Sequence, residues 1–186
     1  KYNLTYDAYS LGAGAKYNFN KRSYIQFDIK NDNYDTNYLY TNEDGDNKVG
    51  DEVRQKRQHY YSGNLKSLFR FTENTRTIFG VEYIQETLDR PSFNVDERAY
   101  TWATYAQEEI TLFKNLQIQA GLRYVYHETA KSNVTPKLAV MYRLGDFTIR
   151  GQYSAGFRAP GLDELYKYSY SQRGTRAGTL SAGNKN

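Results

Sequence analysis

The sequence predicts an all-β protein: an antiparallel transmembrane β-barrel, or a part of one. Three observations predict this class. Apolar residues recur at every second position in segment after segment, aromatic residues are abundant, and short turns alternate with longer loops. A period of two is typical of strands with one apolar face and one polar face. The 186 residues include 20 Tyr and 9 Phe but no Cys, which excludes a disulfide scaffold and a cysteine-based zinc site.

The polar rows of these segments indicate a membrane rather than a soluble sheet. The mean hydropathy is −0.86, and no run of 18 apolar residues exists that would form a transmembrane helix. Arg, Lys, Glu and Gln stand in the middle of the predicted strands, where a soluble sandwich or small barrel would bury Val and Leu. We therefore expect the apolar row to face lipid and the polar row to face a wet lumen. Backbone groups in lipid must all be paired, so the complete sheet has to close.

Eight segments carry the strand pattern. We expect strands at residues 4–17, 23–40, 58–71, 77–88, 98–113, 116–126, 134–144 and 147–157. We expect connections at residues 18–22, 41–57, 72–76, 89–97, 114–115, 127–133, 145–146 and 159–186. Asn residues mark the first turn, Pro91 lies in the fourth connection, and the two-residue link Gly145–Asp146 is typical of a hairpin.

The first four segments differ in how clean their alternation is. Their apolar rows contain Leu11, Ala13 and Ala15; Ile25, Phe27 and Ile29; Tyr61, Leu65 and Phe69; and Phe79, Val81 and Tyr83. Ile78 and Ile84 fall on the opposite row of the fourth segment, so its register stays open. The outer part of the second segment is polar on both faces, which predicts that the sheet continues beyond the membrane.

The last four segments include the clearest strand of the chain, at residues 116–126. In the fifth segment Tyr100, Trp102, Ile110 and Leu112 share a parity, although its faces are ambiguous. We expect the lipid row to contain Leu116, Ile118, Leu122, Leu138, Val140, Ile149 and Tyr153. We expect the lumen row to contain Arg123, Lys137, Arg143 and Arg150. Tyr61, Tyr100, Tyr124 and Tyr126 lie toward strand ends, as in an interfacial aromatic girdle.

The connections alternate between short and long. Bacterial transmembrane barrels have short periplasmic turns and longer extracellular loops. On that rule the turns at residues 18–22, 72–76, 114–115 and 145–146 are periplasmic. The remaining connections are then extracellular, and the chain starts and ends on the outer side.

Two stretches resemble TonB-dependent outer-membrane receptors. The segment GFRAPGLDELY, residues 156–166, resembles their strand-to-loop motif. The segment YAQEEITLFKNLQIQAGLRYVYHE, residues 105–128, resembles their mid-barrel hairpin and contains the typical GLRY. The resemblance implies a barrel of about 22 strands filled by an N-terminal plug. It also implies energised import of cobalamin, a siderophore or haem across the bacterial outer membrane.

This resemblance covers only a part of such a receptor. We expect residues 1–186 to be part of one β-barrel domain, a mid-barrel fragment without the plug or the closing strands. Its partners would be outer-membrane lipid, the plug and remaining strands, TonB through the missing plug, and an unidentified small-molecule ligand. The alternative is a closed eight-stranded outer-membrane barrel with a structural or adhesive role.

Other functions find less support in the residues. No spacing of nucleophile, His and acid suggests a catalytic set, so we expect no enzyme. The net charge of +4 without a clustered basic patch argues against nucleic-acid binding. His59 and His127 lie near loop bases, and no His follows the FRAP segment, so haem specificity is not supported.

The loop after the FRAP segment is the predicted place of ligand capture. Arg158 leaves the polar row where the strand reaches the vestibule, and Pro160 ends strand pairing there. We expect Arg158, Tyr166, Tyr168, Tyr170 and Arg173 to contact the ligand. Their rings can stack on a flat ligand, and the guanidinium groups can pair with its acidic groups. Pairing of Arg158 with a carboxylate of the plug or wall is the alternative.

An acidic loop is the one candidate metal site. Asp44 and Asp46 flank Gly45 in the loop 41–52, and cobalamin receptors, which this chain resembles, bind calcium in such loops. Carboxylate oxygens are the ligands that calcium prefers. Because the spacing is incomplete, a solvated acidic loop is the alternative, and no other cofactor is expected.

Overall fold

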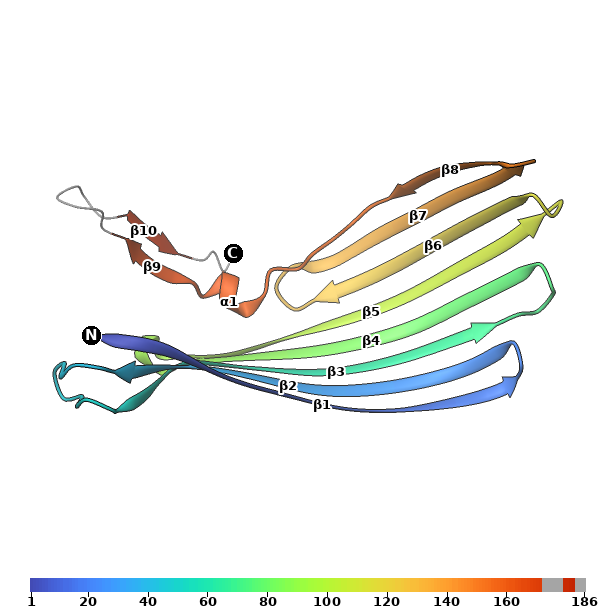
Figure 1. Cartoon of the computed structure of the whole chain (residues 1–186). Helices are drawn as coiled ribbons and strands as arrows, with labels where there is room; N and C mark the ends of the chain where they lie inside the picture. Colours follow the sequence, from blue (N-terminus) through green and yellow to red (C-terminus); the bar gives the residue numbers. More distant parts are fainter. Residues whose placement is uncertain (172–178, 183–186) are drawn as a thin grey trace.

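One large antiparallel sheet makes up most of the structure, a computed structural model that describes residues 1–171 and 179–182. Its strands follow one another in chain order, each pairing with the next (Figure 1). They are β1 (Tyr2–Asn20), β2 (Ser23–Tyr40), β3 (Glu52–Phe69), β4 (Thr75–Arg90), β5 (Val95–Leu112), β6 (Leu116–His127), β7 (Lys131–Leu144) and β8 (Phe147–Ser154). The predicted all-β class and the eight antiparallel strands are confirmed.

Two small elements and one hairpin complete the described chain. The 3-10 helix η1 (Pro91–Phe93) joins β4 to β5, and α1 (Leu162–Leu165) follows β8. The strands β9 (Tyr168–Ser171) and β10 (Thr179–Ala182) pair with each other in a separate two-stranded sheet. Within the described residues no helix has the length and apolar character needed to cross a membrane.

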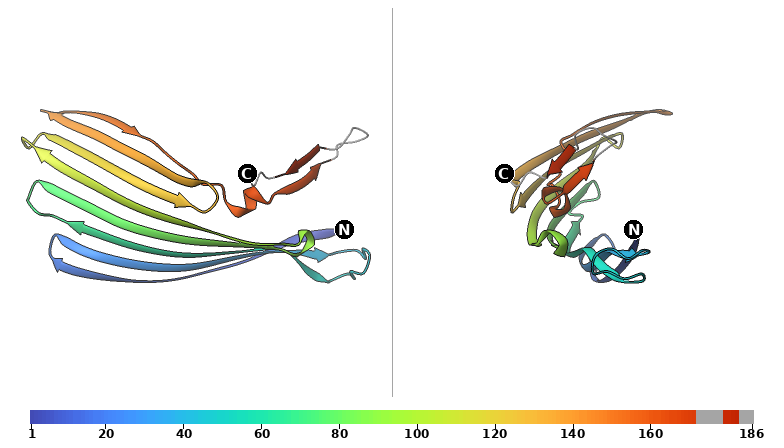
Figure 2. Two further views of the ribbon diagram at one scale, coloured as in Figure 1. Left: turned by 180° about the vertical axis from the view of Figure 1, so that it is seen from behind. Right: turned by 90° about the vertical axis from the view of Figure 1, so that its left-hand side faces the viewer.

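The large sheet is an open, curved wall (Figures 1 and 2). Among the described strands, β1 pairs only with β2, and β8 pairs only with β7. The closed eight-stranded barrel is therefore not what this chain forms here. α1, β9 and β10 lie on the side toward which the sheet curves, which we call the concave face.

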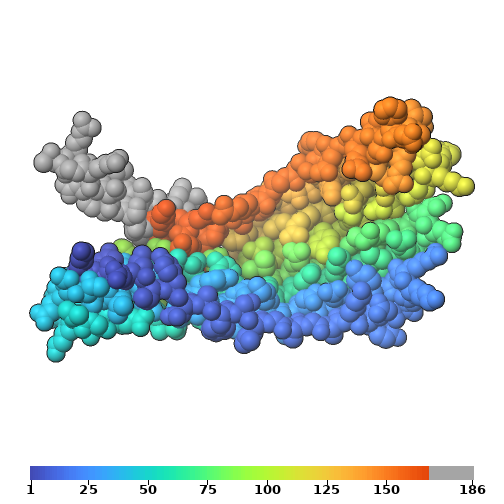
Figure 3. Space-filling view, viewed as in Figure 1, coloured from blue at the N-terminus to red at the C-terminus, as the bar shows by residue number. Residues whose placement is uncertain are grey.

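The two ends of the sheet differ. Tight connections at residues 21–22, 70–74, 113–115 and 145–146 lie at one end, the turn end. The connection at residues 41–51, η1 and α1 lie at the other, the loop end, which also holds the N-terminus (Figure 1). Figure 3 shows the segment after β8, in orange, running along the upper border of the view toward the loop end.

The convex face carries the apolar row. Directly opposed residues of antiparallel strands share a face, and the register joins the apolar positions of neighbouring strands into one surface. Examples of such opposed pairs are Phe27 and Leu65, Leu65 and Val81, Ile118 and Val140, and Leu138 and Tyr153. These side chains are exposed or half-buried, as expected for a surface that meets lipid.

Aromatic side chains border this apolar surface at both ends. Near the loop end, the rings of Tyr83 and Trp102 lie 4.5 Å apart, and those of Tyr100 and Tyr126 lie 6.1 Å apart. Near the turn end, Phe19 stacks on Phe69, with ring centroids 5.7 Å apart. Such paired bands are typical of the two membrane–water interfaces of a barrel.

The opposite row is polar and faces the concave side. Arg123 forms an ion pair with Glu82 at 2.6 Å and lies over the ring of Tyr105 at 5.8 Å. The Tyr105 ring covers Gly80 so closely that a Cβ there would lie 2.1 Å from the Tyr105 Cζ atom. Ile78 and Ile84 also lie on this row, directly opposite Gln107 and Thr101. The register of the fourth strand therefore places Phe79 and Val81 outward, and the two isoleucines are exceptions in a polar row.

The fifth strand contains the converse exception. Glu108 shares the convex row with Ile110 and lies opposite Ala120. The hydroxyl of Thr77 donates a hydrogen bond to the Glu108 carboxylate. A neighbouring hydroxyl thus satisfies this carboxylate near the turn end, and the ambiguous faces expected for this strand have a local cause.

Several strands extend farther at the loop end than expected. β3 begins at Glu52 rather than residue 58, and β7 begins at Lys131 rather than residue 134. In β3 a register shift separates the pairs Thr36–Lys56 and Asn37–Arg54, which interrupts the alternation. The expected loops at 41–57 and 127–133 are correspondingly shorter, because polar residues that are typical of loops continue the hydrogen-bonded pairing of the strands.

The last predicted strand and loop differ most from the expectation. β8 ends at Ser154 rather than residue 157, although Ala155 N still donates to Pro136 O at 3.0 Å. The expected loop at 159–186 contains α1, β9 and β10, none of which the alternation indicates. A four-residue helix is too short for a helical period to stand out in the sequence.

Candidate ligand-binding face at the loop end

The helix α1 begins with a local cap. Gly161 N donates to Glu164 Oε2 at 3.2 Å, while Glu164 N donates to Gly161 O at 3.0 Å. Tyr166 N donates to Leu162 O at 2.9 Å and ends the single turn. An isolated turn of this length is not stable in water, so its contacts with the sheet must hold it.

Apolar packing supplies the first of these contacts. Leu162 and Leu165 pack against Leu88 of β4 and Ala99 of β5, all four buried, and Leu88 is 0% exposed. Val95 and Tyr166 pack against this group from its edge. The loop end thus has a small core on the concave face, formed by residues that are far apart in the sequence.

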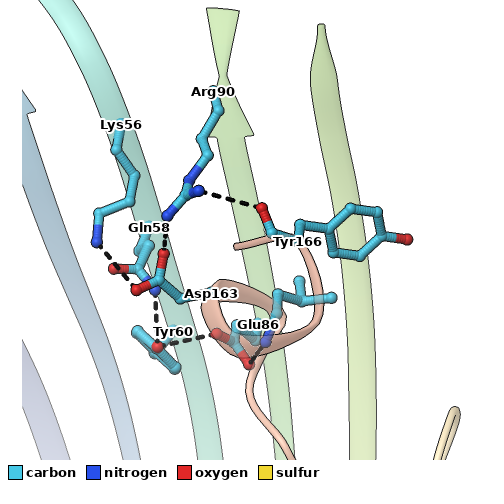
Figure 4. Close-up of polar contacts among 8 residues, drawn as sticks. Lys56, Gln58, Tyr60, Glu86, Arg90, Asp163 and Tyr166 are labelled. Atoms are coloured by element: carbon cyan, nitrogen blue, oxygen red, sulfur yellow. Dashed lines mark hydrogen bonds and ion pairs between the residues drawn. The ribbon is translucent and has the colours of Figure 1, made fainter. Parts of the chain in front are cut away.

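Glu86 of β4 supplies the second contact, as Figure 4 shows. Its carboxylate accepts a hydrogen bond from Leu162 N at 3.2 Å and another from the Tyr60 hydroxyl at 2.9 Å. Gln58 Nε2 in turn donates to the Tyr60 hydroxyl at 3.2 Å. The carboxylate is buried and satisfied by donors from β3 and from the first residue of α1.

Asp163 supplies the third contact. Its carboxylate forms an ion pair with Lys56 Nζ at 3.3 Å and another with the guanidinium of Arg90 (Figure 4). Arg90 also donates to the backbone carbonyl of Tyr166 at 3.1 Å. Two cations of neighbouring strands therefore hold both ends of α1.

These contacts place two of the five predicted ligand residues. Arg158 forms an ion pair with Glu164 at 2.7 Å, and its side chain is 80% exposed. Tyr166 is half-buried beside the apolar group and is anchored through its carbonyl. The backbone of Tyr168 and Tyr170 lies in β9, and Arg173 lies outside the described residues.

The acidic loop forms a tight turn. Asp44 and Asn47 make an isolated β-bridge around Gly45, whose φ of 60° is in the left-handed region. Asp44 and Asp46 are exposed, and no group of three or more metal-ligating His, Asp or Glu occurs in the described part of the chain. Calcium binding at Asp44 and Asp46 stays a prediction.

Both histidine side chains contact neighbouring residues of the wall. The buried His127 accepts hydrogen bonds at Nδ1 from Thr129 N and Ala130 N, both at 3.1 Å, and so closes the β6–β7 turn. The ring of His59 stacks on Tyr61 at 6.2 Å, and His59 shares a strand row with the convex-face residue Leu65. Neither position suits an axial ligand for haem in the vestibule.

A family model described as "TonB dependent receptor-like, beta-barrel" matches residues 1–186, the whole of this chain.

The chain belongs to the TonB-dependent receptor family.

Solved structures of siderophore receptors share its fold. PirA from Pseudomonas aeruginosa is 20% identical with a TM-score of 0.74, over 98% of this chain and 34% of that one. A mutant of the ferric enterobactin receptor PfeA from P. aeruginosa and PirA from Acinetobacter baumannii are each 16% identical. Both have a TM-score of 0.74, over 98% of this chain and 30% of theirs. No match is found among curated proteins.

The chain thus spans about a third of the length of the receptors that it matches. Members of this family are outer-membrane β-barrels that act as receptors and transporters rather than enzymes, and they work with a plug domain and TonB. In such a barrel the convex face of the wall is the lipid face, and the concave face is the lumen face.

Four residues of the loop-end site escaped the sequence-based prediction. The sequence pattern places Lys56 in a loop, does not distinguish Glu86 and Arg90 from other polar strand residues, and marks Asp163 only as part of the family motif. No local signal could have found them, because the helix dipole by itself favours an acidic residue in the first turn of a helix, so Asp163 does not point to a distant cation.

Proposed function

We propose that this chain is part of the wall of an outer-membrane receptor that imports a ferric siderophore, energised through TonB. The observation that carries the proposal is the division between the two faces of the sheet. The convex face is apolar between aromatic bands, while the concave face is polar and holds a docked segment at its loop end. A wall of this kind separates lipid from a wet passage.

The ligand class rests on two kinds of support. The similar structures are named as receptors for siderophores, one of them for ferric enterobactin. Haem is less well supported, because His127 is engaged in a turn and His59 lies beside Tyr61. Cobalamin remains the second candidate, and calcium at Asp44 and Asp46 would favour it, since the cobalamin receptors that the sequence resembles bind calcium in such loops.

Within this proposal the segment after β8 belongs to the ligand-capture surface. Arg158 is exposed at the loop end and offers a guanidinium to the vestibule. Tyr166, Tyr168, Tyr170 and Arg173 follow it in the sequence. Loops on a rigid scaffold are a common place for binding residues, and α1 fixes where this one starts. The plug, the other strands and TonB complete the transporter.

Uptake by cells that express the full-length receptor tests this function. We would supply radio-iron as ferric enterobactin, as an uncharged ferric trishydroxamate or as haem, and would supply labelled cobalamin separately. We expect receptor-dependent accumulation of at least one siderophore complex, and its loss in a TonB-deficient strain. Accumulation of haem or cobalamin alone, or accumulation without TonB, would contradict the proposal.

A further inference from the structure

Lys56 and Arg90 form a pair of cations on the concave face at the loop end. They lie on the neighbouring strands β3 and β4, and their side chains are 21% and 13% exposed. Both bind the carboxylate of Asp163 (Figure 4). Within the described residues Asp163 is the only ion-pair partner of either cation.

Asp163, the carboxylate that pairs with both cations, lies outside the strands that hold them. Asp163 lies on a four-residue helix, whereas both cations lie on long strands of the sheet, where Lys56 pairs with Thr36 and Arg90 pairs with Val95. Its side chain is 40% exposed, so the vestibule reaches the carboxylate more easily than the Arg90 guanidinium beneath it. The neighbouring carboxylate, Glu86, is already satisfied by Tyr60 and the N–H of Leu162.

Displacement of α1 would leave two partly buried cations without a counter-ion. Leaving a buried charge unpaired is strongly unfavourable, so another anion would be favoured in its place. A guanidinium beside an ammonium suits the paired oxygens of a carboxylate or a catecholate.

We propose that Lys56 and Arg90 form a binding site for an anionic oxygen group of the ligand, and that Asp163 occupies this site until the ligand displaces it. The inference rests on the proposed uptake of an iron chelate and narrows the chelate to acidic ones, such as catecholates and carboxylates. Asp163 then acts as an internal competitor that also keeps the cation pair formed when no ligand is present.

A purely structural role for the same contacts predicts a different pattern. If Asp163 only fastens α1 to the wall, loss of any of the three charges loosens the same loop, and all three variants change ligand affinity in one direction. If Asp163 competes with the ligand, its loss acts opposite to the loss of Lys56 or Arg90. The signs of the effects therefore separate the two roles.

Equilibrium binding to the purified full-length receptor in detergent provides the test, with ferric enterobactin, an anionic tris-catecholate complex, as the probe. We expect Lys56→Gln and Arg90→Gln each to raise the Kd about tenfold or more, the scale of one charged hydrogen bond. We expect Asp163→Asn to lower it by about fivefold, the scale of a modest coupling between two binding events. Lys56→Gln and Arg90→Gln should also weaken the dependence of the Kd on salt, because fewer charges then meet the ligand.

Matched controls come from the opposite face at the same end. Arg54 and Asp89 form an ion pair at 3.5 Å between the same two strands, so Arg54→Gln and Asp89→Asn should leave the Kd unchanged. Lys56→Arg keeps the charge and should retain most of the affinity, whereas Arg90→Lys keeps the charge but not the planar fork and should retain more affinity than Arg90→Gln but less than the wild type. If a neutral variant fails to fold, the other cation and its charge-retaining variant decide the result.

The outcomes also separate this inference from the proposed function. If the wild-type receptor binds the probe but Asp163→Asn weakens binding as the Gln variants do, Asp163 is a fastener and the inference is wrong. If the receptor takes up only an uncharged ferric chelate, the inference is wrong while the proposed function stands. If no ferric chelate is taken up, the proposed function itself is wrong.

Discussion

The middle of the wall and its loop-end corner are stabilised in different ways. In the middle, the apolar side chains of the convex face are exposed or half-buried, and the strands are held mainly by their continuous ladder. At the corner, Leu88, Ala99, Leu162 and Leu165 form a buried group with ion pairs and a buried carboxylate around it. In an outer-membrane barrel lipid would cover the first region from outside, whereas the chain has to cover the second itself.

Because of this difference, the surroundings of a side chain depend on its position along the strand in one region and on long-range contacts in the other. In the middle, the parity of a residue along its strand settles whether it meets lipid or lumen. At the corner, Glu86 meets a backbone N–H that is 76 residues away in the sequence, and parity says nothing of that contact. The effect of a substitution on stability should therefore depend on which face of the strand the residue lies on in the middle of the wall. At the corner it should depend on the contacts that the side chain makes.

The largest effect is expected at the corner, for Leu88→Ala. Leu88 is fully buried between β5 and α1, so the substitution removes apolar burial and also leaves a cavity. Such changes cost about 2–5 kcal/mol of stability. Hydrogen exchange measured by mass spectrometry on the full-length receptor should show faster exchange of peptides that cover α1 and the loop end of β4.

The matched control for this change is Leu122→Ala on the convex face. Leu122 is 54% exposed in this chain and would meet lipid, so acyl chains would fill the space that the smaller side chain leaves. Only the transfer part of the cost should remain. Equal losses at both positions would mean that the corner is not a distinct core.

A charge on the convex row of the middle region is expected to have the next largest effect. Val140→Arg should cost about 2–4 kcal/mol of folding free energy, because an Arg near mid-bilayer loses its hydration. Urea unfolding of the full-length receptor in lipid vesicles measures this loss directly.

The neighbouring substitution Ala139→Arg is the control for this charge. Ala139 lies opposite Gln119 and Gln152 on the concave row, so the new charge would meet water or polar groups. Its effect on unfolding should be small. If both variants unfold alike, the assignment of the convex face to lipid is wrong.

The sequence was sufficient to predict the middle of the wall. The pairing of Ile118 with Val140 and of Leu138 with Tyr153 places the expected lipid row on one face, as the alternation requires. Lys137 lies opposite Ser154 on the other face, as expected for the lumen row. A short-range period carries this information, and each strand repeats it.

Strand ends and the corner could not be predicted in the same way. The bulge near Lys56 breaks the alternation of β3, so the sequence of residues 52–57 resembles that of a loop although these residues belong to the strand. α1 is held by Leu88, Glu86 and Arg90, and no local pattern announces contacts over such distances in the chain. Ligand contacts of Tyr168 and Tyr170 in β9 and of Arg173 beyond it stay predictions.

The smallest effect on stability is expected for Arg158→Ala, and this makes Arg158 a clean probe of ligand capture. Its ion pair with Glu164 joins side chains that are 80% and 50% exposed, and such surface pairs contribute about 0–1 kcal/mol. Thermal unfolding of the full-length receptor should therefore hardly change. The Kd for ferric enterobactin should nevertheless rise if the guanidinium contacts the ligand.

The control variant Glu164→Ala separates direct contact of Arg158 with the ligand from an indirect effect. It removes the Arg158–Glu164 ion pair and the cap at Gly161 but leaves the guanidinium in place. A ligand role for Arg158 requires that Arg158→Ala weakens binding more than Glu164→Ala does; equal effects of the two variants would reduce Arg158 to a partner of the cap.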